Sequence, residues 1–246
     1  MASHQIDLEQ ALRVYFVADP GQTPKPITEV VHAALTGGAT MVQLRAKTLH
    51  DLGKYAIGRV LLQACRAAGA AFVVNDRLDI ALALGADGIH LGVDDLPLEE
   101  ARRLSPPGFI IGYSPETDEQ ARRARERGAS YLGVGPVFAT SSKSDAGEAI
   151  GFDVLERRAW LSRLPVIGIG GITPDNTPDV IGAGACGVAV IGAISRSPDP
   201  ESAARAIREA VDDALANPRR WSATPDRRLR CRQPACSDIR MGDRTD

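Results

Sequence analysis

The chain has 246 residues, of which 44% are hydrophobic and 24% charged, and its formal net charge at pH 7 is −2. This length is enough for one large hydrophobic core, and an α/β barrel of this size is normally a single domain. The near-neutral charge gives no overall reason to expect nucleic acid or an anionic membrane as a partner, and the lack of an 18-residue apolar run argues against a membrane span.

Short apolar runs alternate with longer amphipathic stretches along the chain. The runs that predict buried strands lie at residues 13–18, 40–45, 71–75, 88–91, 109–112, 131–135, 166–169 and 187–191. The patterns that predict helices lie between them, at 27–36, 49–68, 78–84, 98–104, 116–127, 152–163, 174–183 and 201–216. Several of these helices are followed by a glycine suited to the left-handed conformation that closes a helix: Gly37, Gly69, Gly85, Gly128 and Gly182.

Eight strands, each followed by a helix, predict parallel pairing through right-handed crossovers. Eight such units predict a single (β/α)₈ TIM barrel over residues 1–216. An open, doubly wound sheet is the alternative, but no glycine-rich dinucleotide turn follows the first strand. Residues 217–246 contain eight arginines, four aspartates and few apolar residues, which predicts a flexible or loosely docked tail.

The four cysteines are too few and too scattered for a disulfide framework. Cys65 and Cys186 lie in apolar contexts that indicate buried free thiols. Cys231 and Cys236 have four residues between them and no neighbouring histidine, which is weak support for a zinc site. The N-terminus has neither the basic start nor the apolar core of a signal peptide, so we expect a cytoplasmic protein.

Two glycine turns follow the last two predicted strands. Gly170 and Gly171 come directly after strand 166–169, where Thr173 and Pro174 have the order of a helix N-cap and first helical residue. Gly192 follows strand 187–191. One explanation is that these glycines only allow close packing of helix on strand. Their recurrence at the two positions where barrels commonly bind phosphate favours a phosphate site.

Polar side chains follow the other predicted strands, on the rim where barrels bind ligands. They include Gln43, Arg45, Lys47, Asn75, Asp76, Arg77, His90, Asp94, Asp95, Ser114, Thr140, Ser141, Ser142 and Lys143. Asp76 and Asp95 are candidate Mg²⁺ ligands, although each alone is an ordinary turn residue. The cations Arg45, Lys47 and Lys143 favour a multiply anionic ligand such as diphosphate, while Lys143 alone also fits a solvated loop.

Five segments carry most of these residues. They are VQLRAK (42–47), VVNDRLDIALALGADGIHLGVDDLP (73–97), IIGYS (110–114), GASYLGVGPVFATSSK (128–143) and PVIGIGGITPDN (165–176). In this order they resemble the thiamine phosphate synthase family, over residues 13–216 but not the tail. The resemblance implies a (β/α)₈ barrel transferase. Such an enzyme joins 4-amino-2-methyl-5-hydroxymethylpyrimidine diphosphate to a (carboxy)thiazole phosphate, forms thiamine phosphate and releases diphosphate.

The resemblance also implies a role for each matched residue. The pyrimidine diphosphate would bind Gln43, Leu44, Arg45, Ala46, Lys47, Asn75, Ser114 and Lys143. Among these, catalysis would rest on Arg45, Lys47, Ser114 and Lys143. Asp76 and Asp95 match the ligands of Mg²⁺, the implied cofactor. The thiazole phosphate would bind Thr140, Ser141, Ser142, Gly171, Ile191 and Gly192.

Three positions depart from the usual pattern of the family. The loop reads TSSK where a second threonine is usual, which keeps the hydroxyl. Gly192 stands where a serine is frequent, so a side-chain hydroxyl is lost. Glu116 stands where a histidine is often found, which argues against a step that depends on that histidine.

Two alternatives to a synthase remain open at this point. The related thiazole tautomerases share the barrel but lack the full diphosphate and Mg²⁺ set, and they rely on a histidine near Ser114, where this chain has Glu116. A non-catalytic sensor would bind a thiamine precursor and use the Arg-rich tail on an acidic partner or nucleic acid. The complete residue set favours the synthase, with small-molecule substrates and no nucleic-acid or membrane partner.

Overall fold

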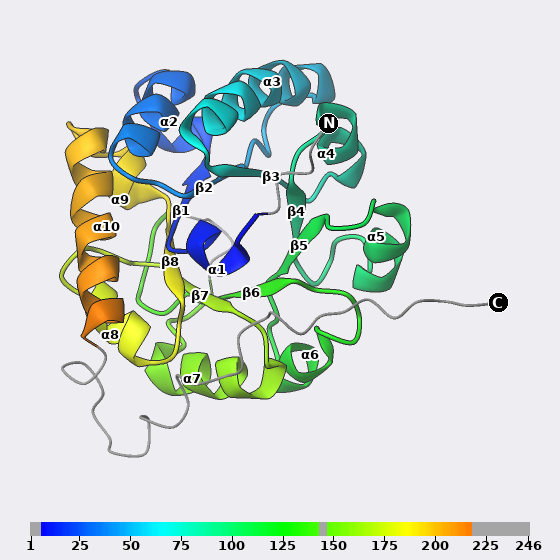
Figure 1. Ribbon diagram of the computed structural model, residues 1–246, viewed down its shortest axis with the longest axis vertical. Coiled ribbons are helices and arrows are strands. Elements are labelled where there is room, and N and C mark those ends of the chain that lie inside the picture. The colour runs from blue at the N-terminus through cyan, green and yellow to red at the C-terminus, as the bar shows by residue number, and fades with distance from the viewer. Residues whose placement is uncertain (1–5, 143–146, 218–246) are drawn as a thin grey trace.

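The computed structural model describes residues 6–142 and 147–217, which form a closed barrel of eight parallel strands ringed by helices (Figure 1). Each strand pairs with the next one in the sequence, and the last pairs with the first. The strands are β1 (Val14–Ala18), β2 (Met41–Leu44), β3 (Ala71–Asn75), β4 (Gly88–Leu91), β5 (Ile110–Tyr113), β6 (Tyr131–Val134), β7 (Val166–Ile169) and β8 (Gly187–Val190). The predicted barrel is confirmed, and every predicted strand end lies within one residue of the observed end.

The eight predicted helices are also present. They are α2 (Ile27–Thr36), α3 (Asp51–Ala68), α4 (Leu78–Leu84), α5 (Leu98–Leu104), α6 (Asp118–Arg123), α7 (Gly151–Ser162), α8 (Thr177–Gly182) and α10 (Pro200–Ala216). Three short helical segments were not predicted, namely α1 (Leu8–Ala11), η1 (Pro20–Gln22) and α9 (Gly192–Ser195). Segments of about one turn are too short to show a helical period in the sequence.

The predicted start of the helix after β7 is wrong. Helix α8 begins at Thr177, not at Pro174, because a turn precedes it. In this turn Asn176 Oδ1 accepts a hydrogen bond from Thr173 N at 2.8 Å, and Asn176 Nδ2 donates to the Gly171 carbonyl at 3.0 Å. The asparagine side chain thus offers the backbone local hydrogen bonds that compete with the helix.

The left-handed backbone is confirmed at three of the five glycines expected to follow a helix: Gly69, Gly85 and Gly128. It is wrong for Gly37, which has φ −74°, and for Gly182, which is the last residue of α8. The positive φ occurs instead at Gly38 and Gly184. Gly37 serves a different purpose, since a Cβ there would lie 2.3 Å from the Glu201 carbonyl oxygen, so the glycine lets α10 approach α2.

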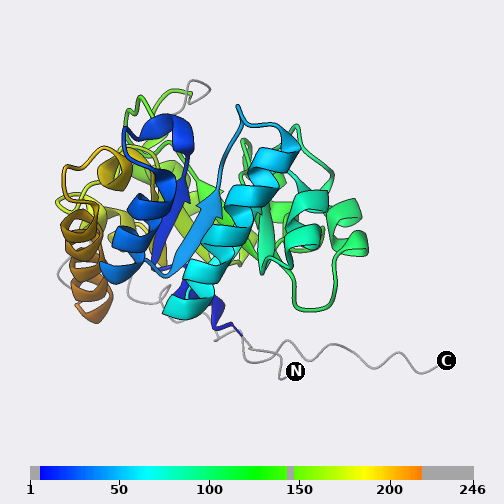
Figure 2. The same ribbon diagram turned by 90° about the horizontal axis from the view of Figure 1, so that it is seen from above.

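Alternate residues of each strand face the helices or the barrel interior, as the period of two requires. Val14 and Phe16 of β1 pack in the outer layer, whereas Tyr15 and Val17 pack inside with residues of the facing strands. Helix α1 packs against this inner cluster. Figure 2 shows α1 at the end of the barrel opposite to η1 and the loops that follow the strands. Helix α1 therefore closes the end of the barrel opposite to these loops.

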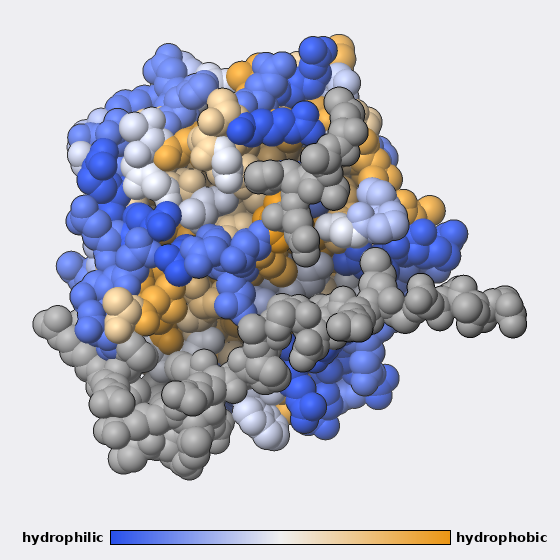
Figure 3. All heavy atoms as spheres, in the orientation of Figure 1, coloured by the Kyte–Doolittle hydropathy of each residue, from blue (hydrophilic) through white to orange (hydrophobic). Residues whose placement is uncertain are grey.

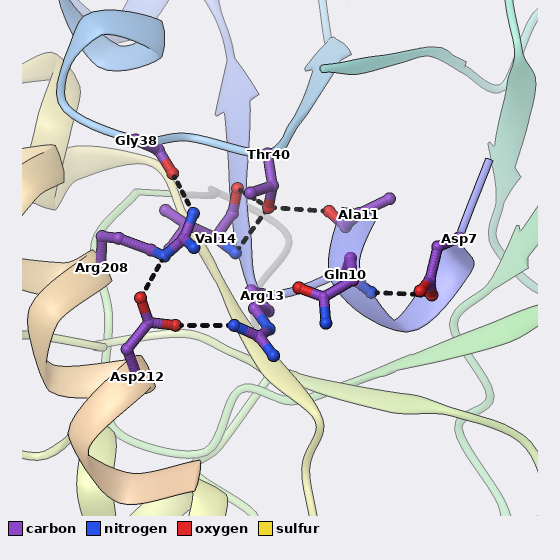
Figure 4. Close-up of polar contacts among 9 residues, drawn as sticks. All are labelled: Asp7, Gln10, Ala11, Arg13, Val14, Gly38, Thr40, Arg208 and Asp212. Carbon is purple, nitrogen blue, oxygen red and sulfur yellow. Dashed lines mark hydrogen bonds and ion pairs between the residues drawn. The ribbon is translucent and has the colours of Figure 1, made fainter. Parts of the chain in front are cut away.

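An ion pair ties the last helix to the start of the first strand (Figure 4). Asp212 of α10 accepts from Arg13 at 3.0 Å and from Arg208 at 2.6 Å. Beside them, the Thr40 hydroxyl accepts from Val14 N at 2.9 Å and so joins the start of β1 to the segment before β2. Of the two ion pairs, Arg13–Asp212 joins α10 to the start of β1, whereas Arg208–Asp212 lies within α10. Both are partly exposed and contribute little energy individually.

Hydrophilic side chains cover much of the helical ring on the face shown in Figure 3, including the region over α2 and α10. Pairs such as Arg205 with Glu201, at 2.5 Å, belong to this exposed surface of α10. Over the residues that the structure describes, none of the helices combines the length and the apolar character needed to cross a membrane.

Cys65 and Cys186 are free thiols, and burial raises the pKa of each to about 12. A thiol that stays protonated is a poor nucleophile. The prediction of a buried free thiol is confirmed for Cys65, whereas Cys186 is a free thiol that is only partly buried. Cys231 and Cys236, and with them the predicted tail beyond residue 217, lie outside the described residues.

Candidate active site

A cavity of about 640 Å³ opens at the carboxyl ends of the strands. Most of the predicted site residues line it: Arg45, Lys47, Asn75, Asp76, Asp95, Ser114, Thr140, Ser142, Gly171, Ile191 and Gly192. They come from the ends of β2 to β8, because parallel strands deliver their carboxyl ends to one rim. Charged and polar side chains from β2 to β5 form one side of the cavity, and the glycine turns after β7 and β8 form the other.

Asp76 and Asp95 meet on the charged side of the cavity. Their carboxyl groups are close enough to interact, since Asp95 raises the pKa of Asp76. Asp76 has a left-handed backbone, with φ 62°, and its N–H donates to the His90 carbonyl at 3.0 Å. Asp95 Oδ2 accepts from Gly92 N at 2.6 Å. A non-glycine residue in this conformation is uncommon and is often found at functional sites.

The electrostatics of this pair fit a cation site. Burial, and then Asp95, raise the pKa of Asp76 to about 6, while Lys47 and Arg45 act in the opposite direction. Two carboxylates this close repel each other unless a proton or a cation lies between them. In the described part of the chain no group of three or more His, Cys, Asp or Glu could hold a metal. Two carboxylates alone suit Mg²⁺, which completes its shell with water and phosphate oxygens, and do not suit structural Zn²⁺.

Arg45 is held at the cavity by Asp19. Its Nη1 donates to Asp19 Oδ2 at 2.5 Å, and both residues are 7% exposed. Asp19 Oδ1 accepts in turn from Gly21 N at 2.9 Å, which fixes the carboxylate at the start of η1. A buried, charge-assisted hydrogen bond of this kind orients the guanidinium as well as stabilising it.

The glycine side of the cavity depends on close backbone contacts. Gly170 and Gly171 have φ 98° and 65°, and a Cβ on Gly171 would lie 2.7 Å from the Ala139 carbonyl oxygen. The loop after β6 therefore rests directly on the glycine turn after β7. Gly192 begins α9, and a Cβ there would lie 2.9 Å from Ser142 Oγ. These glycines thus allow close packing against the loop after β6, not of a helix on a strand. Gly170, Gly171 and Gly192 also line the cavity.

A chain of hydrogen bonds crosses the barrel interior and ends at the cavity. Gln43 Nε2 donates to Tyr15 OH at 2.7 Å, and the two tyrosine hydroxyls, Tyr15 and Tyr131, are 2.8 Å apart. Tyr131 OH lies 2.9 Å from His90 Nδ1, and His90 Nε2 lies 2.9 Å from Ser114 Oγ. This interior chain, made of Gln43, Tyr15, Tyr131, His90 and Ser114, links β1, β2, β6, β4 and the end of β5.

A family model described as thiamine monophosphate synthase matches residues 14–194. The chain belongs to this family. The thiamine-phosphate synthase of Moorella thermoacetica is 50% identical over 190 residues, which are 77% of this chain and 90% of that protein. The thiamine-phosphate synthase of Roseiflexus sp. (strain RS-1) is 48% identical over 203 residues, covering 82% of this chain and 86% of that protein.

Solved structures agree with this assignment. Thiamine phosphate pyrophosphorylase from Pyrococcus furiosus superposes with a TM-score of 0.78 at 39% identity, covering 85% of this chain and all of that chain. A 3-hexulose-6-phosphate synthase superposes with a TM-score of 0.61 at 18% identity, which reflects the shared barrel fold. The resemblance found in the sequence motifs is therefore confirmed for the family and for the fold.

Not every residue that the family resemblance selects lines the cavity. Gln43 belongs to the interior chain, and Leu44 and Ala46 pack in the outer layer, toward the helices. Ser141 accepts a hydrogen bond from Arg196 at 3.3 Å beside the glycine side. Lys143 lies outside the described residues, so its role stays a prediction.

Sequence reasoning missed several residues that shape this family member's site. Asp19 follows β1 and has the sequence context of a cap residue, and Tyr131 lies within β6 and has that of a core residue. Arg158 of α7 is buried, donates to the Pro115 carbonyl at 2.9 Å and also holds the Glu116 carbonyl, so it positions the loop after β5. The alternation of side chains along each strand was a signal that could have helped, because Gln43, Arg45 and His90 all occupy positions that face the barrel interior.

Proposed function

We propose that this family member is a thiamine-phosphate synthase, which joins 4-amino-2-methyl-5-hydroxymethylpyrimidine diphosphate to a thiazole phosphate and releases diphosphate. The observation that carries the proposal is the cavity itself. It places the Asp76–Asp95 pair, Arg45 and Lys47 on one side and a glycine-lined surface on the other. Two anionic substrates can lie next to each other there, and holding them together supplies much of the rate.

The reaction is a substitution at the methylene carbon of the pyrimidine. The bond from this carbon to the diphosphate oxygen breaks, and its electron pair leaves with diphosphate. The ring nitrogen of the thiazole then uses its lone pair to bond the same carbon and becomes positively charged. Arg45 and Lys47 stabilise the negative charge that grows on the leaving group. This scheme needs no protein nucleophile.

Asp76 and Asp95 would hold Mg²⁺. When bound, the ion neutralises negative charge on the departing diphosphate. Deprotonated Asp76 is needed for this role, and its pKa of about 6 leaves it mainly ionised at neutral pH. Arg45 stays aligned with the leaving group because Asp19 holds it.

The glycine side would take the phosphate of the thiazole. Gly171 and Gly192 bring their backbone close to the cavity without side chains in the way, and Thr140 and Ser142 add hydroxyl groups. The Ser142 backbone N–H donates a hydrogen bond to Thr140 Oγ1 at 3.2 Å, which forms a local turn in this loop. Backbone N–H groups and hydroxyls in such a concavity suit phosphate oxygens.

A thiazole tautomerase is less well supported. A reaction on the thiazole alone gives no use for the paired carboxylates, Arg45 and Lys47 on the opposite side of the cavity. The decisive experiment incubates the purified protein with both precursors and Mg²⁺ and follows diphosphate and thiamine phosphate. Equal amounts of both products support the proposal. Conversion of the thiazole substrate without diphosphate release would contradict it.

A further inference from the structure

The interior chain is built into the barrel, and the proposed reaction as described above gives no role to Tyr15, Tyr131 or His90. Tyr15 and Tyr131 are 1% and 0% exposed. A Cβ on Gly112 would lie 2.3 Å from Tyr131 OH and 2.4 Å from His90 Nδ1. A Cβ on Gly133 would lie 3.1 Å from His90 Cε1. Strands β5 and β6 thus have glycines at the points where these rings pass.

The chain has a direction because it starts at an amide nitrogen. Gln43 Nε2 can only donate, so the Tyr15 oxygen accepts. Burial raises the pKa of both tyrosines far above the ordinary value, so each keeps its O–H. Tyr15 therefore needs an acceptor for its own proton, and the Tyr131 oxygen is 2.8 Å away. A buried hydroxyl without an acceptor would lower the stability of the folded protein.

The same reasoning carries the direction to the cavity. Tyr131 accepts from Tyr15, so its own O–H points to His90 Nδ1 at 2.9 Å. An acceptor at Nδ1 places the imidazole proton on Nε2, which lies 2.9 Å from Ser114 Oγ. Ser114 then accepts from His90, and its own proton is left to be donated. Since Ser114 lines the cavity, that proton can meet a ligand.

We propose that the interior chain sets the direction of the Ser114 hydroxyl, so that it donates a hydrogen bond to an acceptor atom of the pyrimidine diphosphate. Tyr131 and His90 are then positioning residues that act through Ser114. Gln43 also acts through the chain rather than by touching the substrate. The identity of the ligand rests on the proposed function, whereas the direction of the chain does not.

The first test measures the imidazole tautomer in the ligand-free protein by ¹⁵N NMR, with the His90 signals assigned by their loss in His90→Gln. We expect a protonated Nε2 and an unprotonated, hydrogen-bonded Nδ1. Tyr131→Phe removes the donor to Nδ1, so a population protonated at Nδ1 should appear. A wild-type histidine protonated at Nδ1, or an unchanged tautomer in Tyr131→Phe, would overturn the proposal. This result is independent of whether the protein makes thiamine phosphate.

The second test is kinetic. Tyr131→Phe should lower kcat/KM for the pyrimidine diphosphate by about 10- to 100-fold, as loss of a positioning hydrogen bond does, and leave KM for the thiazole phosphate unchanged. Tyr113→Phe is the matched control, because Tyr113 is a buried tyrosine of β5 that packs in the outer layer, and its activity should be unchanged. In a Ser114→Ala background, Tyr131→Phe should have no further effect. An equal loss in both backgrounds would show a structural role and overturn the proposal.

Tyr15→Phe keeps the test decisive if Tyr131→Phe does not fold. It breaks the chain one bond further from Ser114. Tyr131 then no longer accepts a hydrogen bond from Tyr15, and its own O–H is free to rotate. The expected changes have the same sign and are smaller. A folded Tyr15→Phe protein, checked by circular dichroism, with a wild-type His90 tautomer and wild-type kcat/KM would overturn the proposal.

Discussion

The two sides of the cavity are built by different means. The side formed by β2 to β5 presents charged groups: Arg45 is held by Asp19, and Asp76 and Asp95 form a carboxylate pair that suits a cation. The side formed by β7 and β8 presents backbone, and it depends on positions without a Cβ, such as Gly171. The first side should therefore be sensitive to the loss of a charge, and the second to the addition of an atom.

The largest effect is expected where charge is removed from the carboxylate pair. Asp76→Ala and Asp95→Ala should each lower kcat by about 10³-fold, because the leaving group loses its charge neutralisation. Steady-state assays over a range of Mg²⁺ concentrations measure this loss and the weaker dependence on Mg²⁺. Near wild-type activity in the double variant would remove the metal assignment.

Asp19→Asn tests the charged side one contact further from the substrate. Its neutral amide can still accept from Arg45 but no longer holds the guanidinium by charge, so kcat/KM for the pyrimidine diphosphate should fall by about 10- to 100-fold. KM for the thiazole phosphate should not change. Asp212→Asn is the control, because Asp212 pairs with Arg13 and Arg208 at the barrel seam. A loss for both substrates alike would mean that Asp19 serves folding and not Arg45.

Gly171→Ala tests the backbone side. The added Cβ would meet the Ala139 carbonyl at 2.7 Å in a residue with φ 65°, so the free energy of unfolding should fall by about 1–3 kcal/mol and KM for the thiazole phosphate should rise. Gly69→Ala is the matched control, since its φ is 70° and nothing lies within 4 Å of the new Cβ. Urea unfolding of both variants isolates the loop contact. Equal losses would show that backbone strain alone is responsible.

The smallest effect is a pH dependence of stability in metal-free protein. The folded state keeps the proton of Asp76 up to about pH 6, whereas the ordinary pKa is 3.8. Between these values the folded state binds more protons than the unfolded chain, so stability decreases as the pH rises and stays lowered above pH 6. Melting temperatures from about pH 4 to pH 7 should show this decrease in wild type but not in Asp76→Asn. Added Mg²⁺ at pH 7 should raise the melting temperature of wild type more than that of the variant.

The barrel could be predicted from the sequence because its signals are local and repeated. Eight apolar runs of strand length, separated by amphipathic stretches, appear at nearly the observed boundaries. The error at Pro174 arose because a short-range proline signal was outweighed by the Asn176 side chain, whose hydrogen bonds depend on the fold of the turn. One-turn segments such as α9 lack any period to detect.

The site residues that directly follow a strand could be predicted from the sequence. Residues whose role depends on a contact across the barrel were harder to predict. Asp76 and Asp95 follow neighbouring strands, so their proximity could be expected. The partnership of Asp19 with Arg45 spans β1 and β2, and that of Tyr131 with His90 spans β6 and β4. A tyrosine within an apolar run gives no local sign that its hydroxyl meets a histidine.

The seam between α10 and β1 bears on how the protein is made. Helix α10 packs against α2 and α8, and β8 pairs with β1, so the two ends of the folded sequence depend on each other. During synthesis the earlier strands can pair as they emerge, but β1 has no partner on its second edge until β8 has left the ribosome. Until β8 is made, β1 therefore has an unpaired edge, and an edge of this kind is open to pairing with another chain.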